Sequence, residues 1–242
     1  WILFREQIKG CKLFILCNPH NPGGVVWTEA ELRAIADICY DEKVLVFSDE
    51  IHADLTLPPH THRPFATVSE KARMNSVTFM SPSKAFNIAG TICLTCTLIF
   101  NEDLRKRFRI YMDAGELDMG HVFAFLSVEA AYSHGTEWLD QCLAYIQGNI
   151  DFVDDFLKNH APKIKAIRPE ASYLVWLDCR ELKLSQKDLN EFFVDKAHLA
   201  LNDGEMFGKE GIGFMRLNVA SPRCIIEKAM KQLADAYQLY IK

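Results

Sequence analysis

Three short apolar runs in the first hundred residues each end in a polar loop, and this pattern restricts the fold more than any other feature. The runs are residues 12–17, 44–48 and 76–80. The second run is apolar without alternation, as expected for a strand covered on both faces. A capping box at Thr28 and Glu31 opens an amphipathic helix between the first two runs. Strands that alternate with helices predict an α/β fold with a mostly parallel sheet and flanking helices.

The polar loops follow the carboxyl ends of these predicted strands. They contain Asn18-Pro19-His20-Asn21-Pro22-Gly23-Gly24, Ser48-Asp49-Glu50-Ile51-His52 and Ser81-Pro82-Ser83-Lys84. Ligands of open α/β sheets bind beyond the carboxyl ends of the strands. We therefore expect the three loops to meet at one edge of the sheet and to form one site there.

Lys84 is the central residue of this predicted site, because it follows a strand and is flanked by the hydroxyls of Ser81 and Ser83. A lysine for an aldehyde and donors for a phosphate are what a Schiff-base cofactor such as pyridoxal 5'-phosphate (PLP) requires. Asp49 then offers a partner for the pyridine nitrogen, although a helix cap or a salt bridge would also account for a carboxylate at a strand end. Asn21 and His52 can both reach a ring hydroxyl, but a lone histidine is often structural.

Arg216 lies within an otherwise largely apolar predicted strand, where an arginine needs a partner. A substrate carboxylate is one candidate and a structural salt bridge is the other. His60-Thr61-His62 lies in a proline-rich loop without an evident third ligand, so no metal site is predicted there.

The second half of the chain predicts a separate, smaller domain. A strand at 91–100 and helices at 101–112 and 122–134 are expected to complete the first domain. Beyond them, helices are expected at 136–160, 186–196 and 222–239, and strands at 164–167, 173–177 and 213–219. The predicted domains are residues 1–135 and residues 136–242, the second including the long connecting helix.

Composition excludes several classes of partner. The net charge is −5, and the largest basic cluster is Arg105-Lys106-Arg107, so nucleic-acid binding is not expected. No apolar run is long enough to cross a membrane. The eight cysteines lie mostly in apolar stretches, which favours reduced thiols in a cytoplasmic protein.

The motifs resemble those of the class I/II aminotransferase superfamily of fold-type I PLP enzymes, and within it the cystathionine β-lyase-like C–S lyases of the MalY/PatB type. The matching segments, in family order, are residues 17–24, 48–55, 81–90 and 216–220. The lyase subgroup is indicated by His20, by residues 87–90, and by His52 where aminotransferases usually have tyrosine.

The resemblance implies a large PLP-binding domain, here partial, and a small C-terminal α/β domain. It implies that Lys84 forms the Schiff base and is the catalytic residue, and that Asp49 contacts the ring nitrogen. The remaining implied contacts are Asn21 and His52 at the ring hydroxyl, Ser81 and Ser83 at the phosphate, and Arg216 with Asn21 at the substrate. No metal is implied, and the full-length enzyme is expected to be a homodimer.

Two departures from the family pattern qualify this picture. Many aminotransferases have a phosphate-binding arginine eight residues after the lysine, where this chain has Ile92. Family members also have a long segment before residue 12, with a glycine-rich phosphate-binding turn and an aromatic residue that stacks on the cofactor. The chain thus resembles the C-terminal part of such an enzyme, and alone it is expected to bind PLP weakly and to be inactive.

The resemblance implies β-elimination from cystathionine or cysteine conjugates, with a thiol, pyruvate and ammonia as products. A class I/II aminotransferase is the alternative enzyme, because both reactions use the same lysine and arginine. A non-catalytic fragment that retains only the fold is the alternative of another class.

Overall fold

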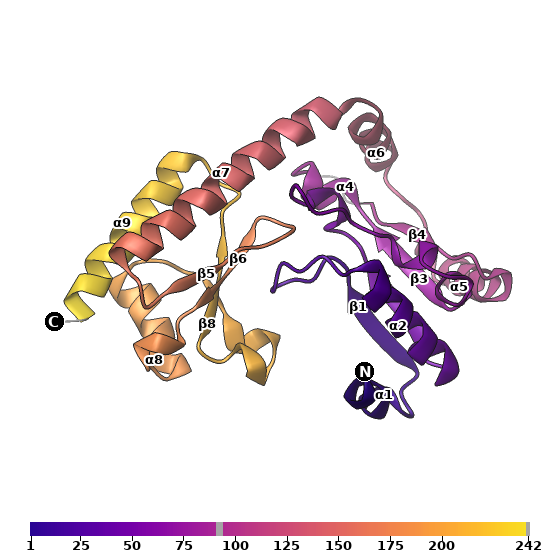
Figure 1. The fold of residues 1–242 in the computed structure, drawn as a ribbon. Coiled ribbons are helices and arrows are strands. Elements are labelled where there is room, and N and C mark those ends of the chain that lie inside the picture. Colours follow the sequence, from indigo (N-terminus) through magenta and orange to yellow (C-terminus); the bar gives the residue numbers. More distant parts are fainter. Residues whose placement is uncertain (91–93, 241–242) are drawn as a thin grey trace. The chain divides into compact units, whose positions relative to one another are not determined.

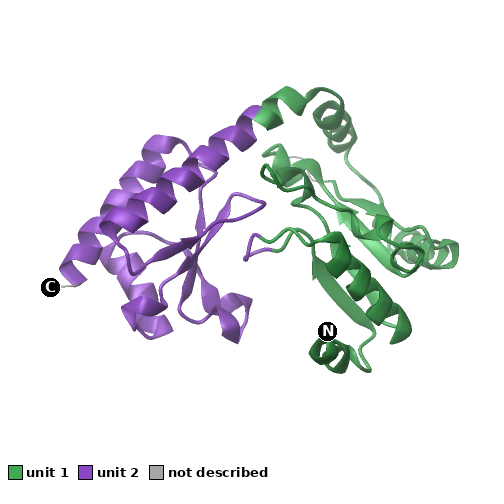
Figure 2. Cartoon of the chain, viewed as in Figure 1, with its two compact units in different colours: residues 1–20, 25–140 green, residues 21–24, 141–242 purple. Residues whose placement is uncertain are grey.

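The computed structural model describes residues 1–90 and 94–240, which form two compact units (Figure 2). Unit 1 comprises residues 1–20 and 25–140, and unit 2 comprises residues 21–24 and 141–242. The division falls within a long helix, α7 (Thr136–His160), whereas the sequence predicts a domain boundary in front of that helix, between residues 135 and 136.

Unit 1 is built on a four-stranded sheet (Figure 1). Its strands, in spatial order, are β1 (Leu13–Cys17), β2 (Leu45–Asp49), β3 (Ser76–Met80) and β4 (Cys96–Leu98). The first three are parallel and β4 is antiparallel to β3, so the predicted α/β fold with a mostly parallel sheet is confirmed.

The predicted strand at 91–100 is longer than the strand that forms. Only Cys96–Leu98 pairs with β3, through Met80, Phe79 and Thr78. Residues 91–93 of this prediction lie outside the described residues. An apolar run does not show where the hydrogen bonds to the neighbouring strand end. Strand ends are therefore the least accurate part of such a prediction.

The helices of unit 1 are α1 (Ile2–Ile8), α2 (Glu29–Asp41), α3 (Glu70–Met74), α4 (Pro82–Ala85), α5 (Glu102–Ala114) and α6 (Val122–His134), with short 3-10 helices η1 (Ala53–Leu55) and η2 (Phe65–Thr67). Side-chain caps start helices α2 to α6, whereas α1 and the two 3-10 helices start without one in the described residues. At α2 the predicted capping box forms: Thr28 Oγ1 accepts the Glu31 N–H, and Glu31 Oε2 accepts the Thr28 N–H at 2.8 Å.

The core of unit 1 lies between these helices and one face of the sheet. Apolar side chains of α2, including Leu32 and Ile35, belong to the same buried cluster as Leu16 of β1, Val46 of β2 and Phe65 of η2. The opposite face of β1 is open, with Ile15 67% exposed. Burial therefore alternates along β1 and β2, as the two-residue repeat of a strand requires.

Unit 2 contains an antiparallel sheet in the order β5 (Lys165–Ile167), β6 (Leu174–Asp178), β8 (Phe214–Asn218) and β7 (Asn202–Asp203). Its helices are α7, α8 (Gln186–Glu191), which continues as a π-helix (Phe192–Lys196), and α9 (Arg223–Tyr240). Asn149 of α7 joins the start of α9 because its Oδ1 accepts from Arg223 Nε at 2.8 Å. Its Nδ2 donates to the carbonyls of Val219 and Ser221.

Residues 21–24 belong to unit 2 because Gly24 contacts the segment before β6. The Gly24 carbonyl accepts the N–H groups of Glu170 and Ala171 at 2.8 and 3.2 Å. Gly24 has a φ of +70°, and a Cβ on it would lie 2.5 Å from Pro169 Cβ. Only glycine meets both conditions without strain, which explains why glycine occupies this position.

Across residues 1–90 and 94–240, no helix has both the length and the apolar character needed to span a bilayer.

Candidate functional site

The three polar loops do share one edge of the sheet in unit 1. Cys17 of β1 pairs with Asp49 of β2, and Asp49 pairs with Phe79 of β3. Because these strands are parallel and adjacent, their carboxyl ends point the same way. The loops that follow the three strands therefore start on the same edge of the sheet, as the sequence predicts. Their first residues are Asn18, Glu50 and Ser81.

Asp49 is half-buried at the end of β2. Its Oδ1 accepts the Ile51 N–H at 3.3 Å. In the described part of the chain no salt bridge involves this carboxylate, so the structural salt bridge considered from the sequence does not form there. His52, three residues later, is buried and immediately precedes η1.

Lys84 lies on α4, the short helix that follows β3, and is half-buried. Within residues 1–90 and 94–240, its amine forms no hydrogen bond or ion pair. The short helix α4 contacts η1, the turn that follows His52. The structure thus brings the lysine, the histidine and the Asp49 strand end together in unit 1.

Ser81 and Ser83 are both buried beside Lys84, and their hydroxyls already have partners. Ser81 Oγ lies 2.8 Å from Ser83 Oγ and 2.8 Å from the Leu94 carbonyl, and it accepts the Ser83 N–H at 3.3 Å. Ser81 therefore serves as the N-cap of α4. These contacts fix both hydroxyls next to Lys84 in the sequence, and Ser81 followed by Pro82 is the sequence signal that could have shown the capping role.

An aromatic cluster holds the residue after this helix. Phe86 stacks on Trp138, with ring centroids 6.1 Å apart, and meets the edge of Tyr132 at 5.9 Å. The Tyr132 hydroxyl donates to Asp54 Oδ2 at 3.1 Å. Burial, aided by the negative charge of Asp54, raises the pKa of Tyr132 above its ordinary value. The cluster links the α4 region to η1, and its members are too far apart in the sequence for a motif to reveal it.

The other two predicted site residues, Asn21 and Arg216, contact each other in unit 2. Arg216 Nη1 donates to Asn21 Oδ1 at 2.8 Å, and Nη2 donates to Asn202 Oδ1 at 2.9 Å. The guanidinium also lies 4.6 Å from the ring centroid of Phe207. Sequence reasoning missed Asn202 and Phe207, because they precede the arginine strand in a segment without a motif.

The Arg216 guanidinium has no counter-charge in its immediate contacts. Both oxygen partners belong to neutral amides, Nε is buried without a hydrogen bond, and no described carboxylate forms a salt bridge with it. Burial lowers the pKa of Arg216 from its ordinary value, and nearby Tyr173 opposes that shift. A cation held by neutral amides is suited to bind an anion, and a carboxylate matches the planar guanidinium best.

One other sequence feature has a structural explanation, and one falls outside the described residues. His62, from the His60-Thr61-His62 loop, places Nε2 2.8 Å from Glu50 Oε2. Ile92, the departure from the aminotransferase pattern, and Cys93 lie outside the described residues.

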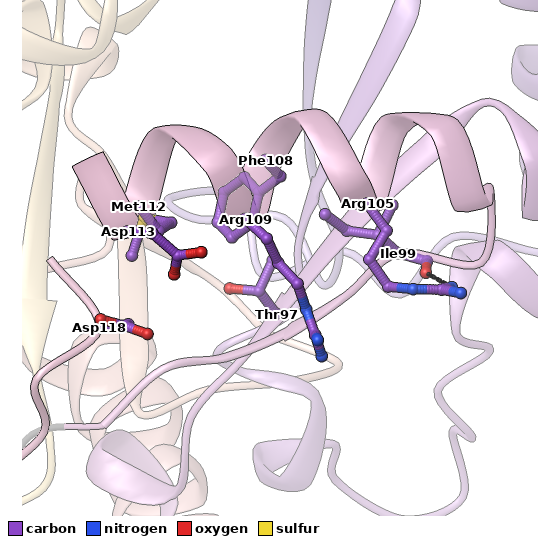
Figure 3. Close-up of a pocket in the computed structure, with 8 residues that line it drawn as sticks. All are labelled: Thr97, Ile99, Arg105, Phe108, Arg109, Met112, Asp113 and Asp118. Carbon is purple, nitrogen blue, oxygen red and sulfur yellow. Dashed lines mark hydrogen bonds between the residues drawn. The ribbon is translucent and has the colours of Figure 1, made fainter. Parts of the chain in front are cut away.

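A pocket of about 460 Å³ lies beside α5, between that helix and the region of β4 (Figure 3). It presents Arg105, Arg109 and Asp113, and Arg105 Nη1 donates to the Ile99 carbonyl at 2.7 Å. None of the predicted site residues lines this pocket, so it is separate from the loops at the sheet edge.

Comparison with known proteins identifies clear relatives. A family model described as aminotransferase class I and II matches residues 4–233. The chain is 39% identical to the cystathionine beta-lyase PatB of Bacillus subtilis (strain 168), over 93% of this chain and 58% of that protein. It is 34% identical to the protein MalY of Escherichia coli (strain K12), over 93% of this chain and 57% of that protein.

A solved structure shows a similarity to the same group of proteins. Cystalysin from Treponema denticola, described as containing a pyridoxal 5'-phosphate cofactor, matches with a TM-score of 0.93 at 35% identity. The match covers 100% of this chain and 61% of that one. The chain thus spans about three fifths of the length of these relatives.

Proposed function

The chain belongs to the class I and II aminotransferase family, and on that premise we propose that the protein is a PLP-dependent C–S β-lyase acting on cystathionine or cysteine conjugates. The similarity to PatB supports the lyase reaction, and the cofactor of cystalysin supports PLP. The structural observation that carries the proposal is Lys84. It lies on α4, the helix that follows β3, and its amine has no ion pair in the described residues. The Asp49 strand end, also without a salt bridge in the described residues, lies at the same edge of the sheet.

The residues present fit PLP. Lys84 offers the amine, Asp49 a carboxylate without a cation, and Ser81 and Ser83 offer hydroxyls. When bound, PLP would draw electrons away from the substrate Cα and so permit departure of a β-thiolate. Lys84 would bind the aldehyde carbon of PLP, and its free amine would be the base that removes the proton from the substrate Cα.

The other side chains would bind and orient. Asp49 would hold a proton at the pyridine nitrogen through its negative charge. Asn21 and His52 would hydrogen-bond the ring hydroxyl, and the two serines would contact the phosphate. Arg216 would bind the substrate carboxylate, because its neutral amide partners leave its charge uncompensated.

The proposal extends to partners. The substrate is an amino acid, and the full-length protein is a homodimer. Exposed apolar side chains on α6, including Val122, Phe123 and Leu126, supply a surface suited to a protein partner. We place the protein in the cytoplasm, a proposal supported by the free thiols of the cysteines within the described ranges.

The test measures two products with the full-length protein. A lyase releases free thiol and pyruvate from cystathionine without an added keto acid. An aminotransferase consumes the amino acid only when a keto acid is supplied, and a non-catalytic protein does neither. Reaction dependent on a keto acid, or no reaction, would contradict the proposal.

A matched pair of variants tests the lysine. Lys84→Ala should remove both turnover and the visible absorbance of bound PLP. Lys106→Ala, an exposed lysine on α5 in the same unit, should retain both. Reductive trapping of the cofactor at a different lysine in the Lys84→Ala protein would refute the assignment.

A further inference from the structure

Glu50, the residue after Asp49, is a fully buried acid with a complete set of partners. Its side chain has no solvent exposure. Oε1 accepts from Ser48 Oγ at 2.8 Å and from the Phe65 N–H at 2.8 Å. Oε2 lies 2.8 Å from His62 Nε2, and the His62 side chain is 10% exposed. All of these groups belong to unit 1.

These contacts attach a loop to the end of β2. His62 and Phe65 belong to the segment between η1 and α3, 12 and 15 residues beyond Glu50. Asn18, which follows β1, fastens the same segment because its Nδ2 donates to the Arg63 carbonyl at 3.0 Å. Two of the three strand ends at the site edge are therefore tied to this one loop.

Glu50 lies on the opposite face of the strand end from Asp49. Burial alternates through Ser48, Asp49 and Glu50, and only Asp49 is half-exposed. The Glu50 side chain therefore points toward the covered face, and it can influence the site only through the backbone that it shares with Asp49.

The backbone around Glu50 forms a closed turn. The Glu50 N–H donates to the Phe79 carbonyl of β3 at 2.8 Å, and the Glu50 carbonyl accepts the Ala53 N–H at 2.9 Å. Inside this turn the Ile51 N–H donates to Asp49 Oδ1 at 3.3 Å. The direction of the Asp49 carboxylate and the position of His52 thus depend on where the Glu50 side chain is held.

We infer that Glu50 and His62 are positioning residues that fix the turn from Asp49 to Ala53 and so aim Asp49 at its ligand; the identity of that ligand as the PLP ring nitrogen rests on the proposed function. A buried acid–base pair is weak evidence for stability, because replacing it with an apolar pair of similar volume often leaves the protein equally stable. A carboxylate with three hydrogen-bonded neighbours in fixed directions does, however, determine geometry.

The first arm of the test needs no cofactor. Amide hydrogen exchange is measured on wild type, Glu50→Gln, His62→Ala and His62→Gln. Glu50→Gln and His62→Ala should lower protection of the Ile51, Ala53 and Phe65 amides at least tenfold. His62→Gln keeps an N–H donor and should restore part of that protection. Loss confined to Phe65 would overturn the inference, because Glu50 would then anchor only the loop.

The second arm uses PLP as the probe and reads the pH profile of its visible absorbance in the full-length protein. Glu50→Gln should shift that profile in the same direction as Asp49→Asn, and by a smaller amount. An unchanged profile with normal occupancy would show a merely structural role and overturn the inference. If wild type has no visible band, the proposed function fails, while the exchange arm still decides whether the turn is held by Glu50 and His62.

Controls use the same substitutions at exposed positions of unit 1. Glu129→Gln and His134→Ala, both on α6, should leave exchange at the turn and the absorbance profile within twofold of wild type. Amides of α2, in the core of unit 1, report whether that unit is folded, because they should keep their protection when only the turn is disturbed.

Discussion

Replacing Arg216 with methionine should leave the stability of unit 2 nearly unchanged while it removes carboxylate binding. The guanidinium has two hydrogen bonds to neutral amide oxygens, at 2.8 and 2.9 Å, and one ring contact, at 4.6 Å. At this half-exposed position, where water replaces the lost donors, these contacts contribute about 2 kcal/mol in total.

Arg216 also lowers the free energy of unfolding, by an amount similar to what its contacts add. Arg216 Nε is buried without a partner, and an unsatisfied buried donor costs about 1–3 kcal/mol. Methionine removes this donor and the uncompensated charge, so the free energy of unfolding should change by no more than about 1 kcal/mol. Residues that serve binding rather than folding show this behaviour.

Asn149→Ala supplies the comparison in the same unit. Asn149 is fully buried and connects Val219, Ser221 and Arg223 through three hydrogen bonds. Its loss leaves those groups without partners and should cost about 2–4 kcal/mol. Urea unfolding followed by circular dichroism measures both variants, and exchange protection of β6 amides assigns the change to unit 2.

Binding is measured in the full-length protein. Losing two charge-assisted bonds to a substrate carboxylate, at about 1.5 kcal/mol each, should raise KM for the amino acid roughly 150-fold. KM for the corresponding amine, which lacks the carboxylate, should not change. An Arg216→Met protein that loses more than about 3 kcal/mol of stability, or that affects both substrates equally, would refute the reasoning.

Three further predictions follow from single residues. Asp49→Asn should keep the fold but lower kcat up to about a thousandfold, because a charge attraction of roughly 4 kcal/mol is lost; near-normal steady-state kinetics would contradict its role. Burial raises the pKa of Cys39 to about 11. A disulfide reagent at pH 8 should therefore modify the exposed Cys11 and leave Cys39 unmodified until the protein unfolds. Peptide mass spectrometry measures the modification of each residue. Burial lowers the pKa of His20, so folding resists its protonation and stability should fall as the pH drops below about 6.5; His20→Gln should flatten this dependence in urea midpoints at pH 7.5 and 5.5.

Local sequence patterns predict the strands, the long helices and the edge on which the site loops lie. These features depend on apolar periodicity and on caps, and both act over a few residues. The short elements are not predictable in this way. Helix α4 and strand β7 (Asn202–Asp203) contain four and two residues, and each depends on a neighbour that is distant in the sequence.

Contacts between distant segments form the part of the site that sequence reasoning misses. Arg216 meets Asn21 across 195 positions, and His62 meets Glu50 across 12. A motif gives the residue types in one loop, but the partner across the fold is decided by strand order and loop length. The sequence therefore predicts Asn21 and Arg216 individually, and the structure shows that one holds the other.

Asp49 and Glu50 show how one strand end gives two adjacent acids different chemistry. The two-residue repeat of a strand directs them to opposite faces. Glu50 enters the covered face, where only a full set of donors makes a buried carboxylate tolerable, and it has Ser48, His62 and the Phe65 N–H. Asp49 stays half-exposed, has no salt bridge within the described residues, and is left available to a ligand. Exchanging the two residues would keep composition and charge but would place aspartate in the buried position and glutamate in the half-exposed one. The swapped protein should therefore lose both stability and the activity of the site.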